Sequence, residues 1–167
     1  MTPDLRDLIM RLLDQHRIMT IATNRSDGWP QATTVSYINE DLILYCYVAR
    51  LSQKYANIRR DNRVSIAIAG NFSEPLEIQG LSLAAKAALV EGKKEFDRIS
   101  DLFLKHYPEY SAWGRPNPAL SPMVRITPEI ISVLDYSKGF GHSDVVRVSR
   151  QDLRTESSHR SSWFASE

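Results

Sequence analysis

Short runs of strand-forming residues, separated by polar turns, constrain the fold of this chain more than any other feature. The turns at 24–28 and 39–41 separate three such runs, at 18–23, 31–37 and 42–48. We expect these three runs to form an antiparallel meander. Further strands are predicted at 64–69, within 77–90, at 123–126 and at 130–136. About six short strands with polar turns favour a small β-barrel over an alternating βαβ array.

Three helices are expected at the margin of this barrel. Thr2 and Pro3 are typical of a helix start, and the apolar residues that follow recur at helical spacing as far as about residue 16. The other two helices are predicted at 52–60 and 93–106. We expect one domain over 1–150 and a polar tail at 151–167. The composition of this tail favours disorder, whereas its Trp163 and Phe164 favour packing against something.

The bulk composition argues against several functional classes. The net charge of +1 gives no sign of a nucleic-acid or membrane surface. No apolar run approaches the ~20 residues that span a bilayer, and the N-terminus lacks the order of a signal peptide. The single cysteine, Cys46, allows no intrachain disulfide, which suits a reducing compartment. We therefore expect a cytoplasmic protein that binds neither nucleic acid nor a membrane.

The junction between the third predicted strand and the second predicted helix is the main candidate for a binding site. Ser52 is a natural N-cap, and Arg50 and Lys54 place positive charge on either side of it. Backbone N–H groups at a helix start, together with two cations, can hold a phosphate. The alternative is an ordinary capped helix with a solvated lysine. Arg59 could reach the phosphate from the second turn or lie on a solvated face.

The order of these segments resembles the flavin-binding split-barrel family whose best-known member is pyridoxamine 5′-phosphate oxidase. The matching motifs are Thr20-Ile-Ala-Thr23, Asp27-Gly-x-Pro30, Thr33-x-Val-x-Tyr37, Leu44-Tyr45 and Ser52-x-Lys-x-x-Asn-Ile-Arg59. They lie within residues 5–135, which is most of the chain. The resemblance implies a mainly β fold, a six-stranded Greek-key split β-barrel with peripheral helices. It also implies a homodimer with FMN at the interface, as in the short relatives often called general-stress flavoproteins.

The resemblance further implies roles for individual residues. Ser52 and Lys54, with Arg50, would hold the FMN phosphate. The edge of the isoalloxazine ring would lie along four residues of the second strand, Thr33, Thr34, Val35 and Ser36.

Other implied contacts lie further along the chain. Tyr47 and Val48 would sit beside the ribityl group, and Gln79 could reach the second flavin across the dimer. Because the flavin supplies the electron chemistry, no protein acid or nucleophile is required. The reaction partner would be a small-molecule electron donor or acceptor, such as NAD(P)H or oxygen.

Two departures from the family pattern bear on the substrate. The vitamin-processing oxidases have an Arg where this chain has Thr33, and a Lys shortly after the flavin strand, where this chain has Tyr37 and Ile38. Because those cations grip the substrate phosphate, pyridoxamine-phosphate oxidase activity itself is not expected here. A flavin-dependent oxidoreductase of unknown substrate and a non-catalytic flavin-binding or sensing module are both compatible with the sequence.

A glycine-rich segment, 139–142, follows the last predicted strand. It is either a surface turn or a loop over the flavin, in which Phe140 stacks and His142 donates a proton or contacts substrate. Some relatives bind haem through a C-terminal His, so haem on His142, or a deazaflavin, is an alternative to FMN. The four histidines show no metal-ligand spacing, and we predict no metal site. Cys46 is expected to be buried and inert.

Overall fold

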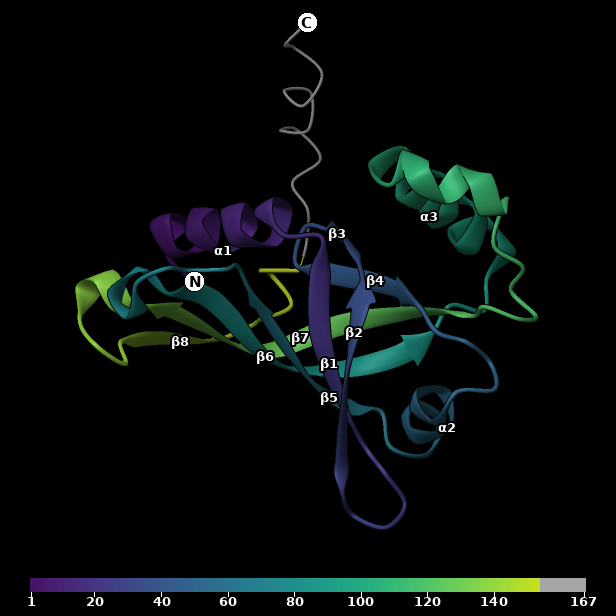
Figure 1. Ribbon diagram of the computed structural model, residues 1–167, viewed down its shortest axis with the longest axis horizontal. Coiled ribbons are helices and arrows are strands. Elements are labelled where there is room, and N and C mark those ends of the chain that lie inside the picture. Colours follow the sequence, from purple (N-terminus) through teal and green to yellow (C-terminus); the bar gives the residue numbers. More distant parts are fainter. Residues whose placement is uncertain (154–167) are drawn as a thin grey trace, which may run out of the picture.

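The computed structural model describes residues 1–153, which form a curled antiparallel sheet with helices at its margins (Figure 1). The strands are β1 (Ile18–Asn24), β2 (Pro30–Ser36), β3 (Ile38–Glu40), β4 (Ile43–Tyr47), β5 (Arg63–Ala69), β6 (Gln79–Leu89), β7 (Met123–Asp135) and β8 (Ser143–Arg147). The α-helices are α1 (Pro3–Gln15), α2 (Gln53–Arg60) and α3 (Lys93–His106). Short 3₁₀ turns lie at η1 (Pro75–Glu77), η2 (Pro108–Trp113) and η3 (Tyr136–Lys138). The chain is thus a mixed α/β split barrel in which strands predominate.

The strand order is β2-β1-β5-β6-β7-β4-β3, and β8 pairs with β7 outside this path. The predicted pairing of the first two strands is confirmed, because β1 and β2 form an antiparallel hairpin. The predicted meander is wrong in its third strand, because β4 pairs with β3 and β7 and not with β2. β2 is therefore left at one end of the sheet and β3 at the other.

The seven predicted strand segments become eight strands among residues 1–153, because two strands are added and two segments merge. β3 and β8 are short and polar in part, so their sequences do not separate them from turns. The predicted strands at 123–126 and 130–136 are instead one strand, β7. Pro128 does not end β7, since the register against β6 shifts there: Ala85 pairs with Pro128 and Ala84 with Ile130. The extra residue on β7 forms a bulge, which accommodates a proline that lacks a backbone N–H.

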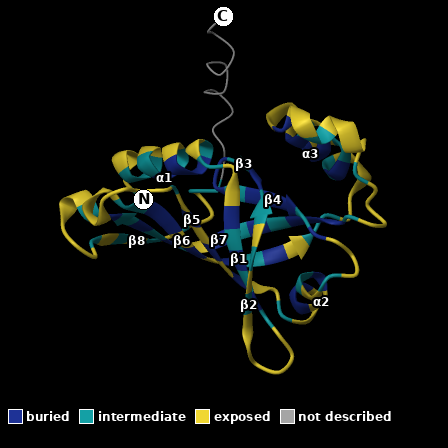
Figure 2. Ribbon diagram, in the orientation of Figure 1, coloured by how far each residue is buried: buried dark blue, intermediate teal, exposed yellow. Residues whose placement is uncertain are grey.

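The core lies between the sheet and the inner faces of the helices, as the buried surfaces in Figure 2 show. The buried face of α1 carries Ile9, Leu12 and Leu13, which recur at helical spacing and pack into the main core. A second cluster lies under α3, where Phe96 and Phe103 contact residues of β3, β4 and β7. The predicted bounds of α3 are confirmed at both ends.

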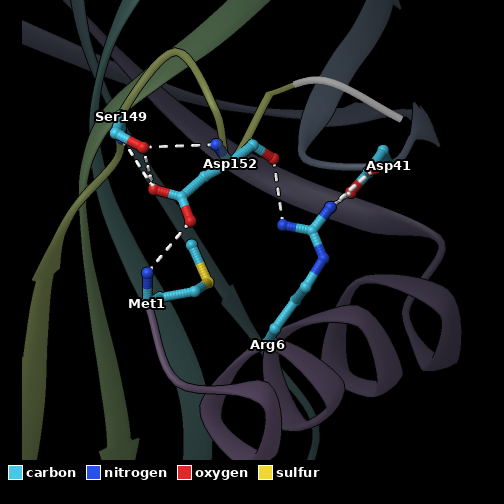
Figure 3. A network of polar contacts seen from close by, with 5 residues as sticks. All are labelled: Met1, Arg6, Asp41, Ser149 and Asp152. Atoms are coloured by element: carbon cyan, nitrogen blue, oxygen red, sulfur yellow. Dashed lines mark hydrogen bonds and ion pairs between the residues drawn. The ribbon is translucent and has the colours of Figure 1, made fainter. Parts of the chain in front are cut away.

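A polar network joins α1 to the end of the described chain (Figure 3). Arg6 donates to both carboxylate oxygens of Asp41, at 2.6 and 2.7 Å, and to the carbonyl oxygen of Asp152 at 2.9 Å. The Asp152 carboxylate accepts from the Ser149 hydroxyl and backbone N–H, and from the Met1 amine. These bonds, the Ser149 hydroxyl first, lower the pKa of Asp152 to about 2. The start of the predicted tail is therefore bonded to the domain through Asp152. The predicted packing of Trp163 and Phe164 concerns residues outside the described range.

Candidate functional site

The predicted strand-to-helix junction is present between β4 and α2. Ser52 is the N-cap of α2, and its Oγ accepts a hydrogen bond from the backbone N–H of Tyr55 at 3.2 Å. The same hydroxyl donates to the carbonyl oxygen of Ala49 at 2.7 Å, which fixes the turn ahead of the helix. The first turn of α2 carries no acidic residue, so the positive end of the helix is not neutralised locally.

Lys54 lies in this first turn, and its side chain is half-buried. Burial lowers the pKa of its ammonium, partly opposed by the nearby Cys46 thiol. Cys46 is fully buried on β4, and burial raises the pKa of its thiol to about 12. Among residues 1–153 the Lys54 ammonium has neither a hydrogen-bond acceptor nor an acidic partner. A partly dehydrated cation without a counter-charge is suited to an anionic ligand.

β2 carries the residues predicted to line the flavin ring. Along this strand Thr33 and Val35 are partly buried, whereas Thr34 on the opposite face is exposed. The Thr33 Oγ1 is buried without a hydrogen-bond partner, and no other side-chain polar atom in the described range is in that state. Such an orphaned hydroxyl is unfavourable unless a ligand or a water satisfies it. β2 is also the end strand of the sheet path, so one edge of its backbone has no neighbouring strand in the described chain.

Several predicted site residues have their side chains occupied elsewhere. The Tyr47 hydroxyl donates to Ser100 Oγ at 2.8 Å, and its ring packs edge-on against Phe103, so this side chain faces α3. Val48 is buried in the main core. The Ser36 hydroxyl shares a 2.6 Å hydrogen bond with the hydroxyl of Tyr110 in η2.

The Arg50 guanidinium is directed at a neighbouring loop. It donates to the carbonyl oxygens of Ala119 at 2.5 Å and Pro118 at 3.0 Å, and to the Tyr55 hydroxyl at 2.9 Å. It lines an open cleft beside α2 whose lining includes neither Ser52 nor Lys54. The structure therefore brings Ser52 and Lys54 into one turn but places the head of Arg50 in a separate cleft.

The remaining predicted residues lie at the other end of the sheet. Gln79 starts β6 and donates to Asp135 Oδ1 at 3.1 Å. His142 pairs its Nε2 with Asp144 Oδ2 at 3.1 Å, and Phe140 is 83% exposed. In Figure 1 this end, at β8, lies far from α2. β6 runs from Gln79 to Leu89 beside the cleft, a span of roughly 30 Å at about 3.3 Å per residue.

Two residues with structural roles at the site were not predicted. Asn57 is 1% exposed and donates to Thr23 Oγ1 at 3.0 Å and to Gln31 Oε1 at 3.4 Å, which ties α2 to β1 and β2. The only sequence signal for a role of Asn57 was its place in the motif Ser52-x-Lys-x-x-Asn-Ile-Arg59. Tyr110 fixes Ser36, and stacks with Tyr107 as part of an aromatic column.

No group of three or more His, Cys, Asp or Glu residues within 1–153 could hold a metal ion. No helix in the same range is both long and apolar enough to cross a membrane.

Comparisons with known proteins identify the family and support the fold. The profile of the pyridoxamine 5′-phosphate oxidase family matches residues 5–134. A solved structure of a candidate pyridoxamine 5′-phosphate oxidase from Listeria innocua is 25% identical, with a TM-score of 0.65 over 78% of this chain and 98% of that one. No curated protein matches at the sequence level.

Two further solved structures share the fold. General stress protein 26 from Bacillus anthracis str. Sterne is 20% identical, with a TM-score of 0.65 over 86% of this chain and 98% of that one. A heme binding protein from Mycobacterium smegmatis is 22% identical, with a TM-score of 0.66 over 88% of this chain and 59% of that one. Because the family profile covers most of the chain, this protein belongs to the pyridoxamine 5′-phosphate oxidase-like split-barrel family.

Proposed function

We propose that this protein binds FMN, with the phosphate at the start of α2. The observation that carries the proposal is the Lys54 ammonium, which is half-buried and has no acceptor or acid beside it within residues 1–153. The N-terminal N–H groups of α2 and the ammonium would together complement a phosphate that carries nearly two negative charges. Ser52 positions this turn through its cap and its bond to Ala49.

The isoalloxazine ring would lie along β2. The orphaned Thr33 hydroxyl supports this placement, because a polar edge of the ring would satisfy it. Alternate residues of β2 direct their backbone N–H and C=O groups to its open edge, where they would supply further donors and acceptors. Ser36 is held by Tyr110, so its backbone, more than its hydroxyl, would be available to the ring.

We also propose a homodimer, which the separation of the two groups of predicted site residues supports. Gln79, Phe140 and His142 lie at the far end of β6 and β7 from α2, and β6 itself is roughly 30 Å long along its course. They could contact a flavin only if a second copy of the chain brings it to them. In this arrangement each dimer would have two sites, and each site would use residues of both copies.

The proposed activity is a flavin-dependent oxidoreduction of a small molecule, with NAD(P)H as a possible electron donor. Bound FMN would supply the two-electron transfer, while the chain binds the phosphate and excludes water from one face of the ring. Pyridoxamine-phosphate oxidation is not proposed. Tyr37 is buried, with its hydroxyl on the Leu13 carbonyl oxygen, and Ile38 lies in the cluster under α3, so neither offers a cation to a substrate phosphate.

The absence of those cations also favours a second candidate function, a flavin-binding module without turnover. The two are separated by adding NAD(P)H to the FMN-loaded protein under anaerobic conditions and following the visible flavin band. Loss of the band and its return on admission of oxygen support the enzyme. A band that no nicotinamide donor bleaches, in protein that binds FMN at one per chain, supports the module.

The dimer proposal is tested by following flavin binding and oligomeric state together. Sedimentation of the protein with and without FMN should show that flavin strengthens the dimer, because a ligand that binds only the dimer stabilises it by mass action. A monomer that keeps one FMN per chain would contradict the shared site.

A further inference from the structure

The cleft beside α2 gathers positive charge and apolar surface outside the proposed cofactor site. Its volume is about 500 Å³, and it lies between α2, the end of β6 and the loop that contains Pro118 and Pro122. Arg50, Tyr55 and Arg59 line it, and Ser52 and Lys54 do not. A volume of this size accommodates a small organic molecule. We call it the α2 cleft.

Hydrogen-bond donors converge on the α2 cleft from all three of these side chains. Arg50 is fixed by its bonds to Ala119, Pro118 and Tyr55, which use one N–H each and leave two N–H groups of its five free. The Tyr55 hydroxyl accepts from Arg50, and its own proton has no acceptor among residues 1–153. Arg59 has no hydrogen bond or ion pair in the same range.

The two guanidinium groups also share one aromatic ring. The Arg50 Cζ lies 5.3 Å from the centroid of Tyr55, and the Arg59 Cζ lies 5.9 Å from it. Two cations thus contact one ring, and neither has an acidic partner among residues 1–153. The one carboxylate that lines the cleft, Glu91, is exposed and forms no ion pair in the described chain. Such an arrangement is unfavourable by itself and becomes favourable when an anion lies between the cations.

We infer that the α2 cleft binds the phosphate group of an organic molecule, held by Arg50, Arg59 and the Tyr55 hydroxyl. Two guanidinium groups suit a phosphate, which can accept paired N–H bonds from each. Leu89 and the two prolines give the non-polar body of the molecule a surface to cover. This site uses residues other than Ser52 and Lys54, so it does not depend on the proposed FMN site.

The phosphate has two possible sources. It is either the second phosphate of a dinucleotide form of the flavin, which would extend past the start of α2, or a group on a separate molecule. Both sources require that the α2 cleft binds a phosphate. Titration of FMN-saturated protein with ADP tests this binding, because FMN then blocks the Lys54 site. Comparison of FAD with FMN on flavin-free protein separates the sources.

The test variant is Arg59→Gln, and Arg60→Gln is its matched control. Arg60 is the next residue on the same helix, is also exposed, and donates to the Asn24 carbonyl oxygen away from the α2 cleft. The two variants remove the same charge from the same helix. Calorimetric titration should give saturable ADP binding that weakens about tenfold or more in Arg59→Gln and changes little in Arg60→Gln, as expected for a lost charge-assisted contact. Arg59→Lys, which keeps the charge but loses the planar fork, should lie between them.

Three results would overturn the inference: no saturable ADP binding, equal weakening in both Gln variants, or an Arg59→Gln variant that loses FMN affinity and keeps ADP affinity. If Arg59→Gln also removes a preference for FAD over FMN, the phosphate belongs to the dinucleotide, and otherwise to a separate molecule. If the protein takes up no FMN, ADP is titrated into the protein alone. Binding that Arg59→Gln weakens and Lys54→Gln does not would uphold the α2 cleft although the proposed function had failed.

Discussion

Replacement of Lys54 by Met should change ligand affinity and stability in opposite directions. Met has a similar length and no charge, so the side chain can keep its half-buried position beside Cys46. In the flavin-bound protein the substitution removes a charge-assisted contact with the phosphate. Such contacts contribute about 1.5–3 kcal/mol, and because Lys54 is only half-buried we expect about 1–2 kcal/mol, or a roughly 5- to 30-fold higher Kd for FMN.

In the flavin-free protein the same substitution should not destabilise the fold. Burial lowers the pKa of Lys54 in the folded state below its usual 10.5, so the folded chain binds this proton less tightly than the unfolded chain. Below the folded-state pKa, the partly buried ammonium is charged and destabilises the fold. As pH rises from that pKa toward 10.5, the folded chain loses this proton first, so the free energy of unfolding increases. Lys54→Met should remove this penalty and with it that part of the pH dependence.

Flavin fluorescence quenching measures the affinity, and urea unfolding of the flavin-free protein measures the stability. Lys94→Met, which removes an exposed lysine from α3, is the control for net charge. An unchanged FMN affinity in Lys54→Met would refute the phosphate site. A large loss of stability in the flavin-free variant would show that Lys54 is held by contacts within the protein and does not wait for a ligand.

Three further predictions concern the surroundings of the site. Asn57→Leu should lower the free energy of unfolding by about 1–3 kcal/mol in urea titrations, because it leaves the buried Thr23 hydroxyl without its partner, and an unchanged midpoint would contradict this. Cys46, whose pKa burial raises to about 12, should react with iodoacetamide only after unfolding, so rapid labelling of the folded protein would disprove its burial. Asp152 has a folded pKa of about 2 against a usual 3.8, so its stabilising effect should be present above 3.8 and lost as pH falls toward 2. In acid-unfolding curves, the Asp152→Asn variant should not show this loss of stability between pH 3.8 and 2. If the curves of the variant and the unmodified protein coincide in this range, the bonds of Asp152 to Ser149 contribute nothing to stability.

The parts of the fold that follow from local sequence could be predicted, and the parts set by distant contacts could not. The capped start of α2 and the β1–β2 hairpin depend on neighbouring residues, and both are present. One of the two partners of β4 is β7, about eighty positions along the chain, and nothing in the sequence of β4 identifies it. β8 lacks a distinctive pattern and exists because β7 offers it an edge.

The same division applies to the site. Lys54 was found because a helix start and a cation within three residues of each other are a local signal. The orientation of Tyr47 depends on α3, and the fixing of Ser36 depends on Tyr110, both more than fifty positions away. Arg50 was grouped with Lys54 by sequence distance, whereas its guanidinium is drawn to the carbonyl oxygens of the 118–119 loop. Proximity in sequence located the turn but not the direction of each long side chain.

The visible absorption spectrum of the purified protein, before and after denaturing release of its ligand, is the measurement to make first. We predict a two-band flavin spectrum and a released molecule that runs as FMN, at one per chain. A Soret band would indicate haem in its place and direct attention to His142. A colourless protein that takes up no added FMN would contradict the proposal and leave Ser52 and Lys54 as an ordinary helix start.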